Sequence, residues 1–226
     1  MNSGLYNQKQ NGSDKLLQEK LELLYEKAIL NYKYVEGSKL AQAFLDAHSV
    51  LKNDPKNLTR LGLIYDHAAM VNKKNQKILE SKARKNYKQA LILDKISPSA
   101  WWGLARIYWH NGNKRAIPYA VKAYHFAKAS SADDVGQYAQ NLGLVYKKLG
   151  NNQRAKYWLK RGIDESPHEW GVHYNLMRFY LDTNDRHHAR ESAKNLLVLL
   201  KKEKINSRWM RDVRHVAKTT ADTLEK

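Results

Sequence analysis

Apolar residues recur along this chain at spacings of three and four, which is the period of an amphipathic helix. Strand-like alternation of apolar and polar residues does not continue far at any point. Only 4 prolines and 11 glycines interrupt the 226 residues, so long helices meet few breaks. We therefore predict an all-α fold.

A five-residue pattern, with leucine first and tyrosine fifth, recurs along the chain. It lies at 61–65, 104–108, 142–146 and 176–180, and the last two copies are 34 residues apart. At the same offset, Ala155 corresponds to Ala189. Self-similarity at a fixed period indicates a protein built from repeated structural units.

These residues resemble the tetratricopeptide-repeat family, whose pattern is Trp-x2-Leu-Gly-x2-Tyr followed by small residues and a proline. Trp101, Leu104 and Tyr108 match it in one copy, and Leu142 and Gly143 match it in the next. The resemblance covers roughly residues 24–203. It implies a right-handed α-solenoid of stacked antiparallel helix pairs, a superhelix that ends in a capping helix.

The expected organisation is a flexible tail at 1–14 and a solenoid at 15–226. Leu30 and Tyr34 are read as part of a degenerate first copy, and the second copy carries about nine extra residues near 71–79, where we expect irregular geometry. The five helix pairs and the capping helix are expected at about 24–57, 55–97, 98–135, 136–169, 170–203 and 207–224.

Glycine and asparagine occur where the pattern needs small residues or tight turns. Gly62 and Gly143 are expected where two helices approach closely, since a side chain there would force them apart. Gly112, Gly150 and Asn184 fall between paired helices, where a left-handed residue is commonly needed.

The chain is strongly basic, with 40 Lys and Arg against 22 Asp and Glu and a formal net charge of +18. Eight basic and two acidic residues lie between 72 and 95, and seven basic and two acidic residues lie between 196 and 218. A lysine-rich surface is ordinarily solvated, but this charge would also attract acidic proteins or nucleic acid.

If the pairs stack as in the family, the first helix of each pair lines a concave groove for a partner. Tryptophans there could instead pack between repeats, and arginines could be merely solvated. Asn141 and Asn175 share one repeat position, which in the family often grips the backbone of a peptide. The candidate groove residues are Arg60, Trp102, Arg106, Trp109, Gln140, Asn141, Lys148, Tyr174, Asn175 and Arg178.

Signals for catalysis, metals or cofactors are weak. The chain has no cysteine, no Gly-rich phosphate loop and no nucleophile elbow. His168 and His173 are five apart, whereas a helical zinc site needs four. The polar start lacks a signal-peptide core, and the longest apolar run, 196–200, is far short of a membrane span. We expect a cytoplasmic protein with no catalytic, metal or cofactor site.

The leading hypothesis is a non-enzymatic scaffold or adaptor that binds a protein or peptide segment in the groove. Charge complementarity favours an acidic partner. The alternative is an RNA-associated helical repeat protein, because a basic surface with Trp and Tyr could stack bases. A chaperone for secreted proteins is a third possibility, with no distinguishing feature in the sequence.

Overall fold

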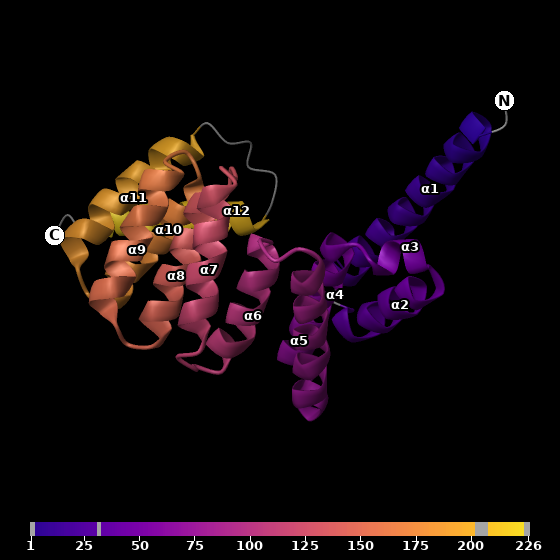
Figure 1. The fold of residues 1–226 in the computed structure, drawn as a ribbon. Coiled ribbons are helices and arrows are strands. Elements are labelled where there is room, and N and C mark those ends of the chain that lie inside the picture. The colour runs from indigo at the N-terminus through magenta and orange to yellow at the C-terminus, as the bar shows by residue number, and fades with distance from the viewer. Residues whose placement is uncertain (1–2, 31–32, 202–207, 224–226) are drawn as a thin grey trace. The chain divides into compact units, whose positions relative to one another are not determined.

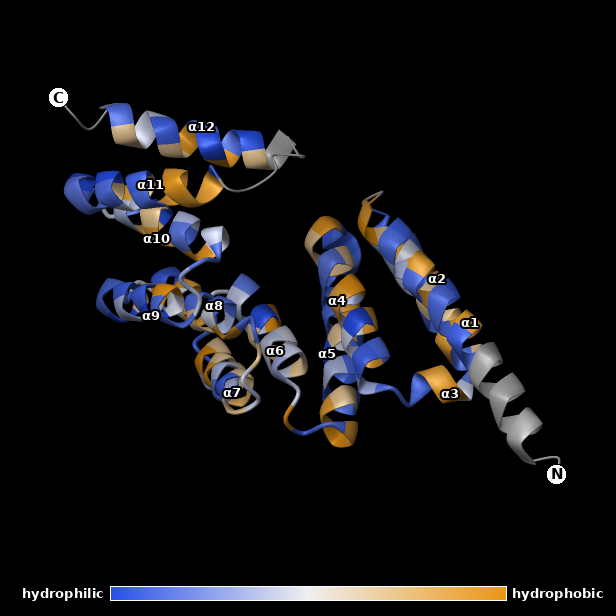
Figure 2. Ribbon diagram, turned by 90° about the horizontal axis from the view of Figure 1, so that it is seen from above, coloured by the Kyte–Doolittle hydropathy of each residue, from blue (hydrophilic) through white to orange (hydrophobic). Residues whose placement is uncertain are grey.

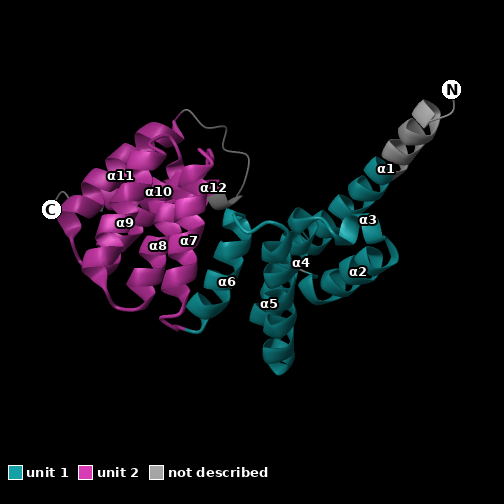
Figure 3. Cartoon of the chain, in the orientation of Figure 1, with its two compact units in different colours: residues 1–111 teal, residues 112–226 magenta. Residues whose placement is uncertain are grey.

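The computed structural model describes residues 3–30, 33–201 and 208–223, and within these ranges every element is a helix. Side chains are described for 14–30, 33–201 and 210–222. The chain divides into two compact units, residues 1–111 and 112–226 (Figure 3). Most helices carry both hydrophobic and hydrophilic residues, as amphipathic helices do (Figure 2). The predicted all-α fold is confirmed.

Unit 1 is built from helix pairs that pack side by side (Figure 1). Helix α1 packs on α2, α4 packs on α5, and α4 also contacts α2 and α6. Its elements are α1 (Ser3–Leu30), α2 (Tyr34–Ala47), α3 (Ser49–Lys52), α4 (Pro55–Val71), the 3-10 helix η1 (Lys73–Asn75), α5 (Gln76–Leu93) and α6 (Pro98–His110).

Unit 2 repeats the paired arrangement. Helix α8 packs on α9 and α10 on α11, while α7 contacts α8 and α12 contacts α11. Its elements are α7 (Ala116–Ala129), α8 (Val135–Lys148), α9 (Asn152–Glu165), α10 (Trp170–Asp182), α11 (Arg186–Leu200) and α12 (Arg208–Thr223). The boundary between the units falls within the expected third pair, 98–135.

The expected left-handed turn residues are confirmed. Gly112, Gly150 and Asn184 have φ angles of 61°, 77° and 57°. Asn151 directly follows Gly150, and its side chain accepts a hydrogen bond from the backbone N–H of Arg154 at the start of α9. Each turn therefore ends one helix and prepares the start of the next.

The expected close approaches also exist. A Cβ atom on Gly62 would lie 2.7 Å from the Tyr87 ring, and one on Gly143 would lie 2.9 Å from Leu159. Gly103 on α6 is tighter still, at 2.3 Å from the same tyrosine. Tyr87 therefore fills the space that two glycines leave open on α4 and α6.

The first repeat lies further upstream than the sequence reading placed it. Leu21 and Tyr25 on α1 are buried and have the leucine–tyrosine spacing of the other copies, forty residues before Leu61 and Tyr65. Leu30, by contrast, is 75% exposed at the end of α1. The first pair is therefore α1 with α2, and no break in secondary structure separates the expected tail, 1–14, from α1, which begins at Ser3.

The extra residues of the second pair mostly lengthen its two helices, and the irregular geometry expected at 71–79 is limited to Asn72 and the 3-10 helix η1. Helix α4 continues six residues past Tyr65, whereas α6, α8 and α10 each continue two residues past the equivalent tyrosine. Helix α5 begins seven residues before Ala83, whereas α9 begins three before Ala155. The insertion thus adds about one turn to each helix, joined by η1.

Helix α12 covers the apolar end of unit 2. Val213 and Ala217 are almost fully buried against a cluster that includes Met177, Leu196 and Leu200 of α10 and α11. This is the position expected of a capping helix, because the last repeat of a solenoid has no further neighbour to bury its apolar face.

Candidate partner-binding faces

A hollow of about 490 Å³ lies along the first helices of unit 1, α1 and α4, and the start of α6. It includes Arg60, a predicted groove residue, and most of its lining residues have polar or charged side chains, although their apolar atoms form much of its wall. The lining residues are Gln18, Glu22, Asp54, Lys56, Asn57, Thr59, Arg60, Leu63, Ser97 and Ser99.

Arg60 is held in place at one edge of this hollow. Its guanidinium forms an ion pair with Glu22 of α1 and lies 5.9 Å from the centre of the Tyr25 ring. About half of the Arg60 side chain remains exposed. It can therefore still meet a partner, but Glu22 already balances its charge.

An amide pair fixes the wall of the hollow. Gln18 and Asn57 exchange two hydrogen bonds of 3.0 Å, and Asn57 also donates to the Leu51 carbonyl. The Tyr25 hydroxyl donates to the Asn57 carbonyl. Gln18 and Glu22 lie upstream of the first predicted pair, 24–57, so they were not among the predicted groove residues, although the leucine–tyrosine spacing on α1 identifies that helix.

The predicted residues on α6 are largely engaged within unit 1. Trp102 and Trp109 are half-buried, with ring centres 6.1 Å apart. Arg106 donates from Nε to the Asp66 carboxylate of α4 at 2.6 Å, and its side chain is 14% exposed. Asp66 is buried, so Arg106 acts as the partner of an interior carboxylate.

Further titratable groups surround this ion pair. Burial raises the pKa of Tyr87 above its ordinary range. Burial, and secondarily the charge of Arg106, lowers the pKa of His67, while Asp66 acts in the opposite direction. The His67 ring stacks on Tyr34 of α2 with centres 5.0 Å apart. The polar cluster therefore lies where α2, α4, α5 and α6 meet.

In unit 2, predicted residues lie on the neighbouring first helices α8 and α10. Asn141, Tyr174 and Asn175 are partly exposed, and Lys148 and Arg178 are exposed. The Asn175 amide donates to the Gly171 carbonyl of its own helix at 3.1 Å. No hydrogen bond to the Asn141 side chain is formed by any residue that the structure describes. Asn141 is therefore the more available of the two asparagines.

Charge on the α8–α10 face is predominantly positive. Lys147 forms an ion pair with Asp182, and Arg178 lies 4.0 Å from the same carboxylate. Lys148 adds a further exposed ammonium group. We define the α8–α10 face as Asn141, Lys147, Lys148, Tyr174 and Arg178.

Gln140 lies apart from this face. Its backbone nitrogen and Cβ are next to Gly162 of α9, where α8 and α9 are in close contact. Its Oε1 atom is buried and accepts no hydrogen bond from the described part of the chain. Gln140, a predicted groove residue, is therefore half-buried beside α9.

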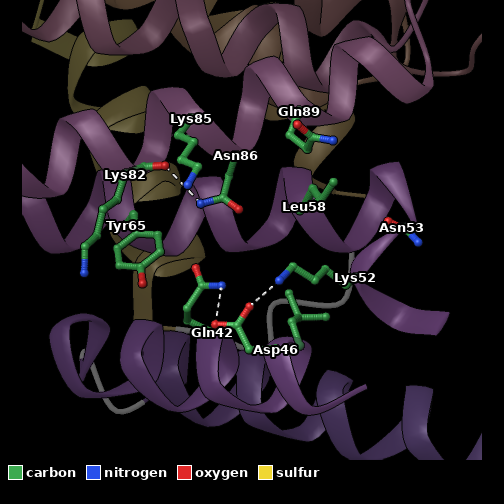
Figure 4. Close-up of a pocket in the computed structure, with 11 residues that line it drawn as sticks. Gln42, Asp46, Lys52, Asn53, Leu58, Tyr65, Lys82, Lys85, Asn86 and Gln89 are labelled. Atoms are coloured by element: carbon green, nitrogen blue, oxygen red, sulfur yellow. Dashed lines mark hydrogen bonds and ion pairs between the residues drawn. The ribbon is translucent and has the colours of Figure 1, made fainter. Parts of the chain in front are cut away.

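A second hollow in unit 1, of about 520 Å³, lies along α2 and α5 (Figure 4). Lys52 pairs with Asp46 at 2.7 Å, and the Lys82 ammonium lies 5.3 Å from the Tyr65 ring centre. Asn86 donates to the Lys82 carbonyl. These helices are the second members of their pairs, and none of the predicted groove residues lines this hollow.

Each leucine–tyrosine copy places a basic side chain over its tyrosine. The cations lie 5.2–5.9 Å from the ring centres. The five pairs are Arg60 with Tyr25, Lys82 with Tyr65, Arg84 with Tyr108, Arg154 with Tyr146 and Lys156 with Tyr180. Part of the basic excess therefore packs within the repeats.

The histidine pair at 168 and 173 is not arranged as a metal site. His173 is buried, and its Nε2 lies 2.9 Å from the Pro167 carbonyl. Within residues 3–30, 33–201 and 208–223, no three His, Asp or Glu residues gather in a metal-binding group. Over the same ranges, no helix is long and apolar enough to cross a membrane.

Stacked helix pairs, left-handed turns and leucine and tyrosine at a recurring spacing are typical of tetratricopeptide-repeat proteins. No family model and no curated protein matches the sequence. Among solved structures, the chain is similar to TTC0263, a thermophilic TPR protein of Thermus thermophilus. The TM-score is 0.64 and the identity 18%, over 90% of this chain and 98% of that one.

Two further structures show the same fold. The Pseudomonas aeruginosa protein PilF gives a TM-score of 0.61 at 14% identity, over 94% of this chain and 90% of its own. Acl4, an assembly chaperone of RpL4, gives a TM-score of 0.55 at 13% identity, over 90% of this chain and 84% of Acl4. The TM-scores show a shared architecture. At such low identities the function must be argued from the faces themselves.

Proposed function

We propose that this protein is a non-enzymatic scaffold or adaptor that binds a segment of a partner protein along the first helices of its repeats. The observation that carries this proposal is the 490 Å³ hollow of unit 1, which lies along α1, α4 and α6. Hydrogen bonds hold its amide wall in place, so little side-chain entropy is lost on binding. Amides, hydroxyls and charges suit the exposed backbone of an extended peptide.

The α8–α10 face supports a preference for acidic segments. Lys147, Lys148 and Arg178 carry three positive charges there against the single carboxylate of Asp182. The unit 1 hollow is more evenly balanced, with Lys56 and Arg60 against Glu22 and Asp54. We therefore assign the acidic preference to the α8–α10 face and peptide-backbone recognition to the hollow.

One structural neighbour supports a protein partner. Acl4 is an assembly chaperone of RpL4, so this architecture serves protein recognition in at least that case. The lack of cysteine is compatible with a reducing compartment, and we propose that binding takes place in the cytoplasm.

RNA binding remains the alternative, because the net charge of +18 attracts polyanions. Base stacking needs exposed aromatic rings. Among the side chains that the structure describes, Tyr157, at 61%, is the only aromatic one that is more exposed than half-buried. The candidate Trp102 and Trp109 are half-buried against each other. This favours the protein partner.

The test compares partner capture by the full chain and by three variants. Asn141→Ala/Arg178→Ala alters the α8–α10 face, and Ser99→Phe places a bulky ring at the hollow. The matched control, Asn195→Ala/Arg186→Ala, makes the same changes at exposed positions of α11. Purified proteins would be incubated with nuclease-treated lysate, and captured segments would be measured again as isolated peptides by calorimetry.

We expect each face variant to lower peptide affinity by about tenfold or more, and the control to bind as the wild type does. Scrambled peptides of equal charge would reveal attraction by charge alone. Equal binding by all four proteins, or partners that disappear with nuclease, would contradict the proposal.

A further inference from the structure

The connection between α4 and α5 forms a projecting end of unit 1. Both helices continue about one turn beyond their counterparts, which extends this end by roughly 6 Å at 1.5 Å per residue. Figure 1 shows it as the lower end of α5. We call residues 70–79 the hairpin tip.

Three aliphatic side chains of the hairpin tip are exposed. Met70 and Val71, at the end of α4, are 42% and 61% exposed, and Ile78, near the start of α5, is 60% exposed. Leu79 is buried, so the tip is anchored on the rest of the pair. Single exposed apolar residues are common, and what sets this end apart is that its exposed aliphatic residues occur beside three lysines and no acidic residue.

The same end carries uncompensated positive charge. Lys73, Lys74 and Lys77 are exposed, and no acidic residue occurs between positions 70 and 79. None of the three joins an ion pair with any described residue. The next acid, Glu80, instead accepts hydrogen bonds from the amides of Gln76 and Asn111. The three lysines line a shallow hollow of about 410 Å³.

We propose that the hairpin tip docks on the surface of an anionic lipid bilayer. Aliphatic side chains at a projecting end can enter the boundary between headgroups and acyl chains, while lysines beside them meet phosphate and carboxylate headgroups. The neighbouring helix α6 continues only two residues past its tyrosine, so within unit 1 it ends before the tip does.

Other occupants fit the tip less well. Nucleic acid would use the lysines but leave the aliphatic side chains in water, and residues 70–79 include no arginine or aromatic residue for stacking on bases. An acidic peptide would find only the shallow polar hollow, which Val71 and Met70 do not line. A bilayer surface uses both kinds of side chain together.

The test is sedimentation of the full chain with phosphatidylcholine vesicles, with and without phosphatidylserine. Val71→Ser/Ile78→Ser removes aliphatic groups from the tip, and Lys73→Glu/Lys74→Glu reverses two charges. Matched controls make the same kinds of change near the other end of α5. Ile92→Ser/Ile96→Ser alters side chains that are 67% and 61% exposed, and Lys88→Glu/Lys95→Glu alters two exposed lysines.

We expect binding only to vesicles that contain phosphatidylserine. The lysine variant should bind about 20-fold more weakly or worse, since each lysine near an anionic surface contributes about fivefold. The aliphatic variant should bind about tenfold more weakly. Both controls should remain within about twofold of the wild type. Melting curves would verify folding, and alanine would replace serine at 71 and 78 if the melting temperature fell.

Four results would overturn the proposal. The first is that the wild type does not sediment with vesicles, and the second is that tip and control variants lose vesicle binding equally. The third is that only the lysine variant loses vesicle binding. The fourth is that RNA binds in a manner that depends on the tip while vesicles do not bind. Equal losses would assign the effect to overall charge, and a loss confined to lysine would exclude insertion. The partner-binding variants at Asn141 and Arg178 should sediment normally, so this test stands apart from the proposed protein partner.

Discussion

Arg106 of α6 and Asp66 of α4 form an interior ion pair that links the first helices of two successive repeats. The Nε–Oδ2 distance is 2.6 Å, and the two side chains are 14% and 2% exposed. Tyr87 of α5 lies in the same cluster, so the ion pair also borders the second helix between them. A residue predicted to bind a partner thus holds repeats together.

Arg106→Ala should lower the free energy of unfolding by about 3–5 kcal/mol, because it leaves the Asp66 carboxylate buried and unpaired. Urea unfolding followed by circular dichroism measures this change. Arg178→Ala removes the same side chain from an exposed position and should cost less than about 0.5 kcal/mol. Equal effects of the two variants would show that the interior pair contributes nothing.

Gly103→Ala should destabilise the protein by about 1–3 kcal/mol, since the new methyl group would lie 2.3 Å from the Tyr87 ring. Thermal melts compare it with Gly171→Ala, where the nearest group is the flexible end of Glu169 at 3.2 Å. Alanine favours helix by about 0.5–1 kcal/mol over glycine, so the control should be neutral or more stable. A stable Gly103→Ala protein would contradict the close approach of α5 and α6.

Val213→Asp should loosen α12 from unit 2, because it places a charge among Met177, Leu196 and Leu200. We expect a loss of about 3 kcal/mol or more and increased binding of an apolar dye, measured by melting and fluorescence. His215→Asp introduces the same group at an exposed position of the same helix and should change little. If both variants behave alike, α12 does not cap the core.

The pKa of His67 predicts a loss of stability in mild acid. Burial and the nearby Arg106 lower this pKa below its ordinary value of 6.5. His110 also lowers the pKa, whereas Asp66 raises it. The unfolded state therefore binds the proton more readily. Stability from neutral His67 is complete above pH 6.5 and is lost as the pH falls toward the folded pKa.

His67→Phe retains a ring to stack on Tyr34 but cannot be protonated. Its melting temperature should fall less than that of the wild type between about pH 7 and about pH 5.5. His215→Phe, at an exposed position, should leave the wild-type pH dependence intact. The same slope in all three proteins would show that His67 does not control it.

Much of the fold could be predicted because its signals are local. Leucine and tyrosine four residues apart mark one helical face, and Gly150 and Asn184 mark turns that only a few residue types tolerate. The first repeat was misplaced because Glu22 stands where Gly62 stands in the next copy. Leu21 and Tyr25 have the spacing of the other copies, but the small residue that follows the leucine in the family pattern is absent from this copy.

The site was less predictable because its partners are distant in sequence. Arg106 and Asp66 are 40 residues apart, and only packing shows that they meet. Glu22 lies 38 residues from Arg60 and just upstream of the first predicted helix pair, 24–57. Helical register places a side chain on a face, but it does not show which neighbouring groups already form hydrogen bonds or ion pairs with that side chain.

The cation over each repeat tyrosine has a consequence for covalent modification. Acetylation of Lys82 or Lys156 would remove the charge that lies over Tyr65 or Tyr180, and the packing of that repeat would weaken with it. Arginine fills the other three positions and is not open to this change. Lysine acetylation at these two repeats would therefore act on the fold itself.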